Sequence, residues 1–300
     1  MKKLLILAAS LTLIAAIIVI PIFSASAAVF VQDGKYKYQL YDDSTASLAG
    51  YISDTVDDVT VPRSYNDYTV VGVSNFALQN NSNVRTIDFM EAPDLEKIGM
   101  YAFNKCTSLE SVLVPSSISY VDVSAFRECA SLTDVTFYGN NNVVPVECFY
   151  KCSSLKTVRL SARLKSIQSL AFAGCASLEY LELMDTVTYI APNAFDGDEN
   201  LTLGVWYDSY AYQYAKDNNI SYVLLDGAKL GETDGDGSVN INDVTTIQRY
   251  LAELETLEGI YLHAADANQD GTVDIADATL LQEFLAEYTV GHPVGEVMTQ

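Results

Sequence analysis

The sequence predicts an α+β protein of more than one domain, with a β-rich solenoid followed by a small all-α module. Two periods carry this prediction. Apolar positions recur every 23 residues through the middle of the chain, and acidic loops recur 34 residues apart near its C-terminus. Units that repeat at a fixed period of roughly 20 to 50 residues stack on one another, because one unit cannot bury its apolar face alone. The 300 residues are 49% hydrophobic, which is enough for a sizeable core.

The N-terminus, residues 1–28, is predicted to be a signal peptide. Lys2 and Lys3 precede an apolar run from Leu4 to Phe23, and small residues at 24–28 offer a cleavage site. The run is long enough to span a bilayer, so an uncleaved anchor is the alternative. We expect cleavage and export, and no second run of that length follows.

The chain is strongly acidic, with a formal net charge of −22. A chain of this charge repels nucleic acid and anionic membranes and attracts cations. We therefore expect no nucleic-acid partner and, after signal cleavage, no membrane partner.

The solenoid is expected over residues 29–226. Its unit reads A-F-x-x-C-x-S-L-x-x-V-x-L, as in "AFNKCTSLESVLV" at 102–114, and Phe76 is expected to join the phenylalanine column with a 27-residue step. A small apolar thiol at a fixed place in each unit predicts a buried core position, and oxidation between neighbouring units is the alternative. The columns are Phe103, Phe126, Phe149, Phe172 and Phe195, and Cys106, Cys129, Cys152 and Cys175; Cys148 is off the register.

The ends of the solenoid are expected to be capped. Residues 29–70 are predicted to form short strands, and residues 204–225 a short helix and a strand. In the terminal units, Gln79 and Asp198 are expected to occupy the place of the cysteine, where a repeat meets solvent or a cap.

Each unit is predicted to contain one strand of the L-x-x-L-x-L type. In "LESVLV" (109–114), Leu109, Val112 and Val114 are expected to point inward, since side chains alternate between the faces of a strand. Trp206 falls on the inward register. Tyrosines on the open face could stack on sugar rings or anchor a protein partner, although an ordinary solvated face is the alternative. The open-face positions include Thr136 and Glu182, and the ligand candidates are Tyr138, Arg159, Tyr180 and Tyr207.

This unit resembles the BspA-like leucine-rich repeats of bacterial surface and secreted proteins. The recurring A-F-x-x-C-x-S-L carries the resemblance over roughly residues 35–225. It implies a leucine-rich-repeat domain for adhesion or protein recognition, without shared catalytic residues.

The 34-residue repeat contains two cation loops, "ETDGDGSVNIND" at 232–243 and "DANQDGTVDIAD" at 266–277. Oxygen-bearing side chains stand at positions 1, 3, 5, 9 and 12, glycine at position 6 allows a sharp turn, and position 7 offers a backbone carbonyl. All-oxygen ligands in a long flexible loop favour Ca²⁺ over Mg²⁺, and we expect two ions. The expected ligands are Glu232, Asp234, Asp236, Ser238, Asn240 and Asp243, and Asp266, Asn268, Asp270, Thr272, Asp274 and Asp277.

A helix with one apolar stripe is predicted after each loop. The stretch before the first loop, "LDGAKLG" (225–231), has no helical pattern, so the unit is loop-then-helix, one half of an EF-hand. The stripes are Val244, Ile247, Tyr250, Leu251 and Leu254, and Ala278, Leu281, Phe284, Leu285 and Tyr288.

This module, expected over 227–290 with a tail at 291–300, resembles type I dockerins. The resemblance implies folding that depends on Ca²⁺ and docking onto a cohesin module of a scaffoldin, with specificity at loop positions 10 and 11 and on the following helix. It departs at Glu232, where the family has Asp, and in lacking the Ser-Thr pair at positions 10 and 11. The implied cohesin-binding residues are Ile241, Asn242, Gln248, Arg249, Ile275, Ala276, Gln282 and Glu283.

Two alternatives concern this docking surface. Ile241 and Ile275 could instead pack under their loops. Either helix could meet the same cohesin, and the opposite charges of Arg249 and Glu283 predict a preference for one orientation. Exchanging the two charges without changing the orientation would contradict that preference.

We expect no enzyme, because His263 and His292 lack the neighbours of a zinc site or a catalytic triad. The predicted function is that of a secreted, extracellular, cellulosome-type component, held by cohesin while its solenoid recognises a protein or carbohydrate ligand in support of polysaccharide catabolism. The alternatives are a free or cell-surface adhesin with a calcium-stabilised module, and a hydrolase.

Overall fold

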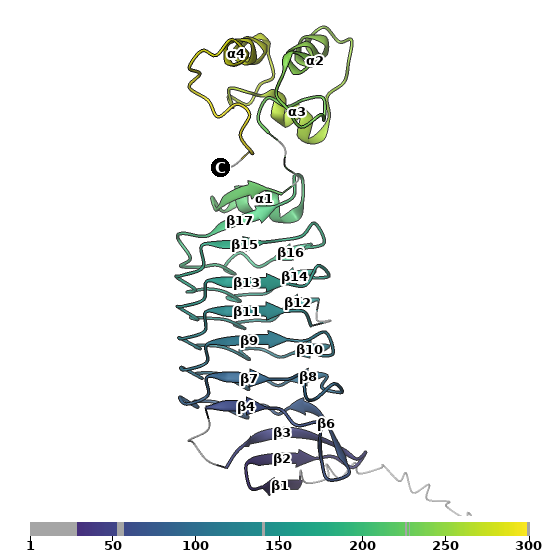
Figure 1. The fold of residues 1–300 in the computed structure, drawn as a ribbon, viewed down its shortest axis with the longest axis vertical. Coiled ribbons are helices and arrows are strands. Elements are labelled where there is room, and N and C mark those ends of the chain that lie inside the picture. The colour runs from purple at the N-terminus through teal and green to yellow at the C-terminus, as the bar shows by residue number, and fades with distance from the viewer. Residues whose placement is uncertain (1–28, 53–56, 140–141, 226, 228, 299–300) are drawn as a thin grey trace, which may run out of the picture.

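The computed structural model describes residues 29–298 apart from 53–56, 140–141, 226 and 228. The predicted signal peptide at 1–28 lies outside the described residues. An elongated β-solenoid carries a helical module at its C-terminal end (Figure 1). Among the described helices, none combines the length and the apolar character that crossing a membrane requires.

Short strands form the N-terminal cap, as the sequence predicted. They are β1 (Val29–Asp33), β2 (Tyr36–Leu40), β3 (Thr45–Tyr51), β5 (Ser64–Tyr65) and β6 (Tyr68–Val73). The first three are antiparallel neighbours, and β3 then pairs in parallel with β6. Because β6 continues in parallel into the solenoid, the cap covers one end of the repeat stack.

Two ladders of parallel strands run along the solenoid, each divided into shorter hydrogen-bonded sheets. The long-strand ladder contains β4 (Asp58–Thr60), β7 (Thr86–Asp88), β9 (Ser111–Val114), β11 (Asp134–Phe137), β13 (Thr157–Leu160), β15 (Tyr180–Glu182), β17 (Thr202–Val205) and β18 (Ser221–Leu224). The short-strand ladder contains β8 (Lys97–Ile98), β10 (Tyr120–Val121), β12 (Val143–Val144), β14 (Ser166–Ile167) and β16 (Tyr189–Ile190). We call the outward-facing side of the first ladder the long-strand face.

A column of stacked phenylalanines forms the centre of the solenoid. Adjacent rings from Phe103 to Phe195 lie nearly parallel, with centroids 5.2 to 5.7 Å apart. Leu109, Val112 and Val114 are buried as the alternation predicts. Each turn thus buries one aromatic side chain, which contributes substantially to the stability of the stack.

The register cysteines are buried, and no disulfide joins the described cysteines. Each thiol donates to a carbonyl of the preceding unit: Cys129 Sγ lies 3.2 Å from Phe103 O, and Cys152 Sγ lies 3.2 Å from Phe126 O. Burial raises the pKa of Cys106 to about 12 and also raises the pKa of Cys129 well above its usual value. The thiols are therefore protonated core groups rather than nucleophiles.

The start of the phenylalanine column differs from the prediction. Leu78, not Phe76, occupies the place before Phe103, because Cys106 Sγ donates to Leu78 O as Cys129 Sγ donates to Phe103 O. Phe76 is 49% exposed and stacks on Tyr101. The first step is therefore 25 residues, and Asn81, not Gln79, is equivalent to the register cysteine. The first unit contains two more residues than the 23-residue period, and the sequence prediction placed the phenylalanine column two residues too early.

Strand β17 also breaks the 23-residue register. Leu181 pairs with Leu203, a step of 22, so Val205 takes the buried position at the end of β17. Trp206 was predicted to face the core, but it is 37% exposed. Loss of one residue moves every following side chain to the other face of a strand, and this explains the error.

The C-terminal cap consists of helix α1 (Tyr210–Asp217) and strand β18, as predicted for 204–225. The Ser209 side chain accepts a hydrogen bond from Tyr212 N and so caps α1. Helices α2 (Ile241–Leu251), α3 (Gly259–Ala265) and α4 (Ile275–Leu285) follow. Helix α3 was not predicted.

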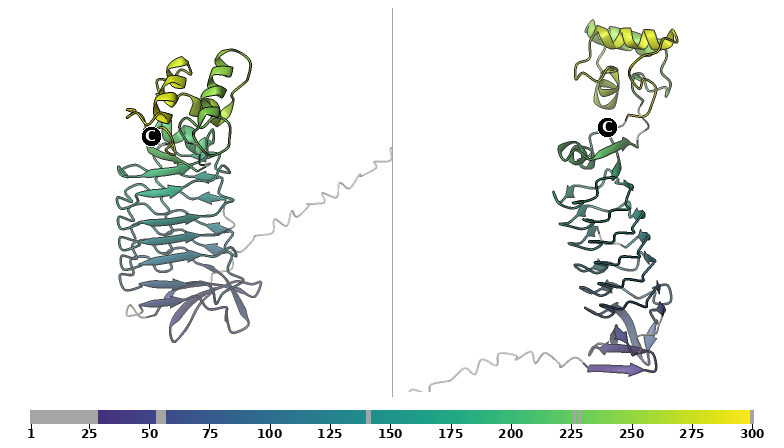
Figure 2. Two further views of the ribbon diagram at one scale, coloured as in Figure 1. Left: turned by 45° about the horizontal axis from the view of Figure 1, so that its top comes forward. Right: turned by 90° about the vertical axis from the view of Figure 1, so that its left-hand side faces the viewer.

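The chain end returns to the junction between the two regions. Lys229 and Val297 form an antiparallel bridge, Leu224 N donates to Met298 O, and Leu230 N donates to Glu296 O. Met298 is buried in the cluster that includes the solenoid core. We call residues 294–298 the C-terminal clasp. In Figure 2 the C-terminus accordingly lies between the helical module and the solenoid.

Candidate functional site

The two cation loops are each fixed to the helix that follows. Asn240 and Asp274 are the N-caps of α2 and α4, and their side chains accept from the backbone N–H groups of Asn242 and Ala276. Asp243 and Asp277 complete a capping box in each case. Positions 9 and 12 of each loop are therefore held in place by the helix start.

The position-12 carboxylates are fully buried. Asp243 accepts from Thr233 N and Asn240 N, and Asp277 accepts from Asn268 N and Asp274 N. Burial raises the pKa of Asp277, and the nearby carboxylates of Asp266 and Asp274 add to the effect. Buried anions beside further carboxylates require a cation, so the loops fit the charge of a divalent metal.

The first loop brings its leading carboxylates together. Oxygens of Glu232, Asp234 and Asp236 lie within 4.8 Å of one another. The glycines at position 6, Gly237 and Gly271, have φ values of 82° and 92°, a conformation that glycine adopts without strain. The donor set is all oxygen, and the residues present therefore fit Ca²⁺.

Position 1 differs between the loops in its hydrogen bonds. Asp266 accepts from the N–H groups of Asp270 and Gly271, at positions 5 and 6. Glu232 instead accepts from Gly235 N, at position 4. The extra methylene of Glu232 thus changes which part of the loop its carboxylate holds.

The helices after the loops present the predicted docking side chains to solvent. Ile241 is 60% exposed and Ile275 is 63% exposed. They do not pack under their loops, which was the alternative. The other six candidates are also exposed: Asn242, Gln248, Arg249, Ala276, Gln282 and Glu283.

The predicted helix stripes are only partly buried. Val244, Ile247, Ala278 and Leu281 lie in the core of the helical module. The last members, Leu254 and Tyr288, are 71% and 69% exposed, because α2 and α4 end before them. Helix α3 packs on the same core through Ala265.

The charge on α2 is partly neutralised. Arg249 Nε lies 2.9 Å from Glu255 Oε2, and both side chains are about half exposed. The difference in charge between the two docking surfaces is thus smaller than the residue types Arg249 and Glu283 alone imply. The preferred orientation of docking stays a prediction.

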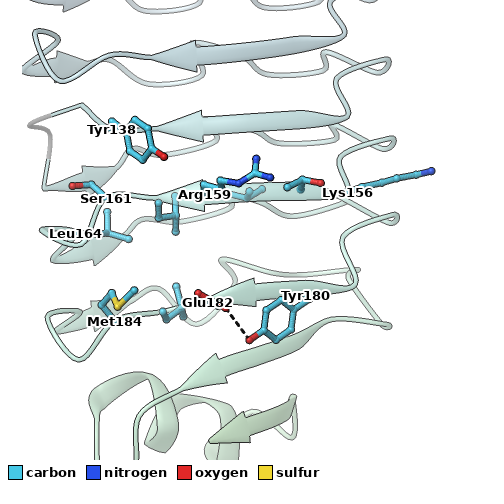
Figure 3. Close-up of a pocket in the computed structure, with 12 residues that line it drawn as sticks. Tyr138, Lys156, Arg159, Ser161, Leu164, Tyr180, Glu182 and Met184 are labelled. Atoms are coloured by element: carbon cyan, nitrogen blue, oxygen red, sulfur yellow. Dashed lines mark hydrogen bonds between the residues drawn. The ribbon is translucent and has the colours of Figure 1, made fainter. Parts of the chain in front are cut away.

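On the solenoid, the long-strand face brings three of the four ligand candidates together. Tyr138, Arg159 and Tyr180 line one hollow of about 510 Å³ over β13 (Figure 3). Tyr207 does not join them, since its ring contacts Tyr212 and His263 at the C-terminal end. Thr136, expected to be exposed, is buried between Leu113 and Arg159, its larger neighbours on the adjacent strands.

Two further residues that bear on this hollow were not among the predicted ligand candidates: Ser161 lines it, and Gly204 lies against the Tyr180 ring. Ser161 lies 23 residues after Tyr138 and continues its column, so the period could have found it. Gly204 could not have been found, because it lies opposite Glu182 only in the shortened register.

Comparison with known families agrees with both parts of the chain. Residues 71–202 match the BspA type leucine rich repeat region in six copies, and residues 230–286 match the dockerin type I domain. The chain thus carries a BspA-type leucine-rich-repeat region followed by a C-terminal type I dockerin domain. No curated protein matches the chain.

Solved structures resemble the solenoid. A leucine rich cell surface protein of Faecalibacterium prausnitzii is 25% identical with a TM-score of 0.50; the match covers 61% of this chain and 55% of that protein, about half its length. A leucine-rich repeat protein of Eubacterium ventriosum is 18% identical (TM-score 0.47, 58% of this chain and 51% of that one). A leucine rich repeat protein of T. pallidum is 21% identical (TM-score 0.40, 58% and 70%).

Both regions belong to families of protein–protein interaction modules. Both belong to non-catalytic families that are typical of extracellular proteins, and type I dockerins bind calcium.

Proposed function

We propose that the dockerin attaches this protein, in the presence of Ca²⁺, to a cohesin module of a scaffoldin. One observation supports it most directly: both loop–helix units expose an isoleucine at loop position 10, and α2 and α4 lie at the end of the molecule remote from the solenoid (Figure 2). Exposed large apolar side chains beside polar ones are typical of docking surfaces. A cohesin could reach them without meeting the repeats.

The loops are proposed to hold two Ca²⁺ ions, with the ligands predicted from the sequence. Each ion would neutralise the buried carboxylate at position 12 and so order the start of the docking helix. Cohesin binding should therefore be lost when the metal is removed.

The solenoid is proposed to recognise a protein or carbohydrate, so that the secreted protein assists polysaccharide breakdown within the assembly without catalysing it. The proposed chain organisation is a signal peptide at 1–28, the repeat domain at 29–226, and the dockerin at 227–290.

Calorimetry of the chain against a panel of cohesins tests the docking role. We expect saturable binding to at least one cohesin with Ca²⁺ and none with excess chelator. Calcium uptake without binding to any cohesin would instead favour a free adhesin, with the residues at positions 10 and 11 of each loop as the reason.

A further inference from the structure

The hollow on the long-strand face is a shaped depression between two tyrosines. Tyr138, directly after β11, stands at one side, and Tyr180 and Met184 stand at the other, while β13 with Arg159 lies between them (Figure 3). Tyr138 is 50% exposed and Tyr180 is 41% exposed, so neither ring serves the core. The volume of about 510 Å³ lies within the range of ligand-binding pockets.

The polar groups in and beside the hollow are held before any ligand arrives. Arg159 Nη1 lies 3.2 Å from Asp134 Oδ2, and the Tyr180 hydroxyl donates to Glu182 Oε1 at 3.3 Å. Planar side chains fixed in this way keep free donors and acceptors in defined directions, which lowers the entropy cost of binding.

A missing side chain allows Tyr180 to lie across the sheet. Gly204 on β17 pairs with Glu182, and a Cβ at Gly204 would lie 3.0 Å from Tyr180 Cζ and closer still to its hydroxyl. Only glycine leaves this room, so the position of the tyrosine depends on the shortened last repeat.

The charges around the hollow favour a neutral ligand. Lys156 and Arg159 are positive and Glu182 is negative. Arg159 is already paired with Asp134, so the charges in and beside the hollow nearly cancel. The whole chain is acidic, so an anionic ligand would be repelled. Two exposed tyrosine rings suit the apolar faces of sugar rings, while the Arg159 and Glu182 side chains suit their hydroxyl groups.

We propose that this hollow binds a neutral oligosaccharide, with sugar rings against Tyr138 and Tyr180 and hydroxyl groups on Arg159 and Glu182. The inference rests on the proposed recognition role of the solenoid and narrows its ligand to one chemical class. Cohesin docking does not depend on it, because the dockerin helices lie at the far end of the molecule.

The test is calorimetry of the full chain, in Ca²⁺, with neutral hexasaccharides of β-linked glucose, xylose and mannose. We expect saturable binding to at least one of them, weakened about tenfold or more by Tyr138→Ala and by Tyr180→Ala. Gly204→Ala should weaken binding too, since the added Cβ displaces the Tyr180 ring although Gly204 itself is not a proposed sugar contact. Tyr189→Ala is the matched control, because Tyr189 is 44% exposed on β16 and lies outside the hollow. This variant should bind the sugar as wild type does.

Several outcomes would overturn the proposal. One is an absence of binding to every neutral sugar. A second is binding by the Tyr138 and Tyr180 variants that is as tight as that of wild type. A third is preferential binding of an oligogalacturonate or a peptide that those variants abolish. Cohesin titration of the same variants should be unchanged, and this separates a failure here from a failure of the docking role.

Discussion

The rings of Tyr207 and His263 lie 5.6 Å apart and join the end of the solenoid to the helix that enters the second cation loop. Ala264, next to His263, and Leu230 belong to the same buried cluster as the solenoid core. The repeat region and the dockerin are therefore packed against each other rather than connected by a free linker.

The C-terminal clasp should stabilise this junction. Met298 is 4% exposed, so Met298→Ala is expected to lower the free energy of unfolding by about 2 kcal/mol. The neighbouring Val297 is 38% exposed, and Val297→Ala should have little effect. Urea denaturation of both variants checks this. A Met298→Ala loss as small as that of Val297→Ala would show that the clasp does not hold the junction.

The carboxyl group of Asp198 should make stability depend on pH. It occupies the place of the register cysteine in the last unit, and within the described part of the chain neither of its oxygens has a hydrogen-bond partner. Burial raises its pKa to about 7 from 3.8, an effect that the nearby N–H groups of Cys175 and Gly174 offset only in part.

The direction of this pH dependence follows from which state of the chain binds the Asp198 proton. Between pH 4 and pH 7 the folded chain keeps the Asp198 proton and the unfolded chain loses it, so the free energy of unfolding falls as the pH rises. Asp198→Asn removes this loss of stability at higher pH. Thermal melts in Ca²⁺ should show the variant more stable than wild type by the order of 2 kcal/mol at pH 8 and less so at pH 5. A difference that does not change with pH would contradict the assignment.

The phenylalanine column gives a stability test that separates the two registers. Phe126→Ala removes a fully buried ring and should cost about 3 to 5 kcal/mol. Phe76→Ala should cost under about 1 kcal/mol, because Phe76 only stacks on Tyr101 at the surface. Chemical denaturation of the two variants compares them, and a loss of similar size at Phe76 would restore the 27-residue step.

How far the sequence predicts this fold depends on whether the register is unbroken. From Phe103 to Phe195 the 23-residue period places the phenylalanine column correctly, because stacked units repeat the same contacts. Errors arise at Phe76 and Trp206, where two residues are added or one is lost. A period cannot show such a shift, and on a strand a shift of one residue exchanges the faces.

The two acidic loops and the helices that follow them were predictable because their spacing is local. The hollow was predictable only in part, since Tyr138, Arg159 and Tyr180 come from three units and meet through strand pairing. Helix α3 and the clasp carry no periodic signal, because their few apolar residues pack on parts of the chain that are distant in sequence.

The two position-1 residues should set the relative affinities of the loops. Glu232→Asp is expected to tighten calcium binding at the first loop by about tenfold, since a shorter side chain can hold the loop as Asp266 does. Asp266→Glu is the mirror-image control and should weaken the second loop. Competition titration against a chromophoric chelator measures both. Unchanged affinity in both variants would mean that position 1 does not distinguish the loops.

The most direct test of the docking role is a titration of the full chain in Ca²⁺ with a cohesin found in the panel. We compare Ile241→Asp, Ile275→Asp and the double variant with Leu254→Asp, a control for exposed apolar character. If either helix can dock, each single variant keeps measurable binding, the double variant loses at least about a hundredfold in affinity, and Leu254→Asp binds normally. A double variant that binds as tightly as wild type would contradict the account.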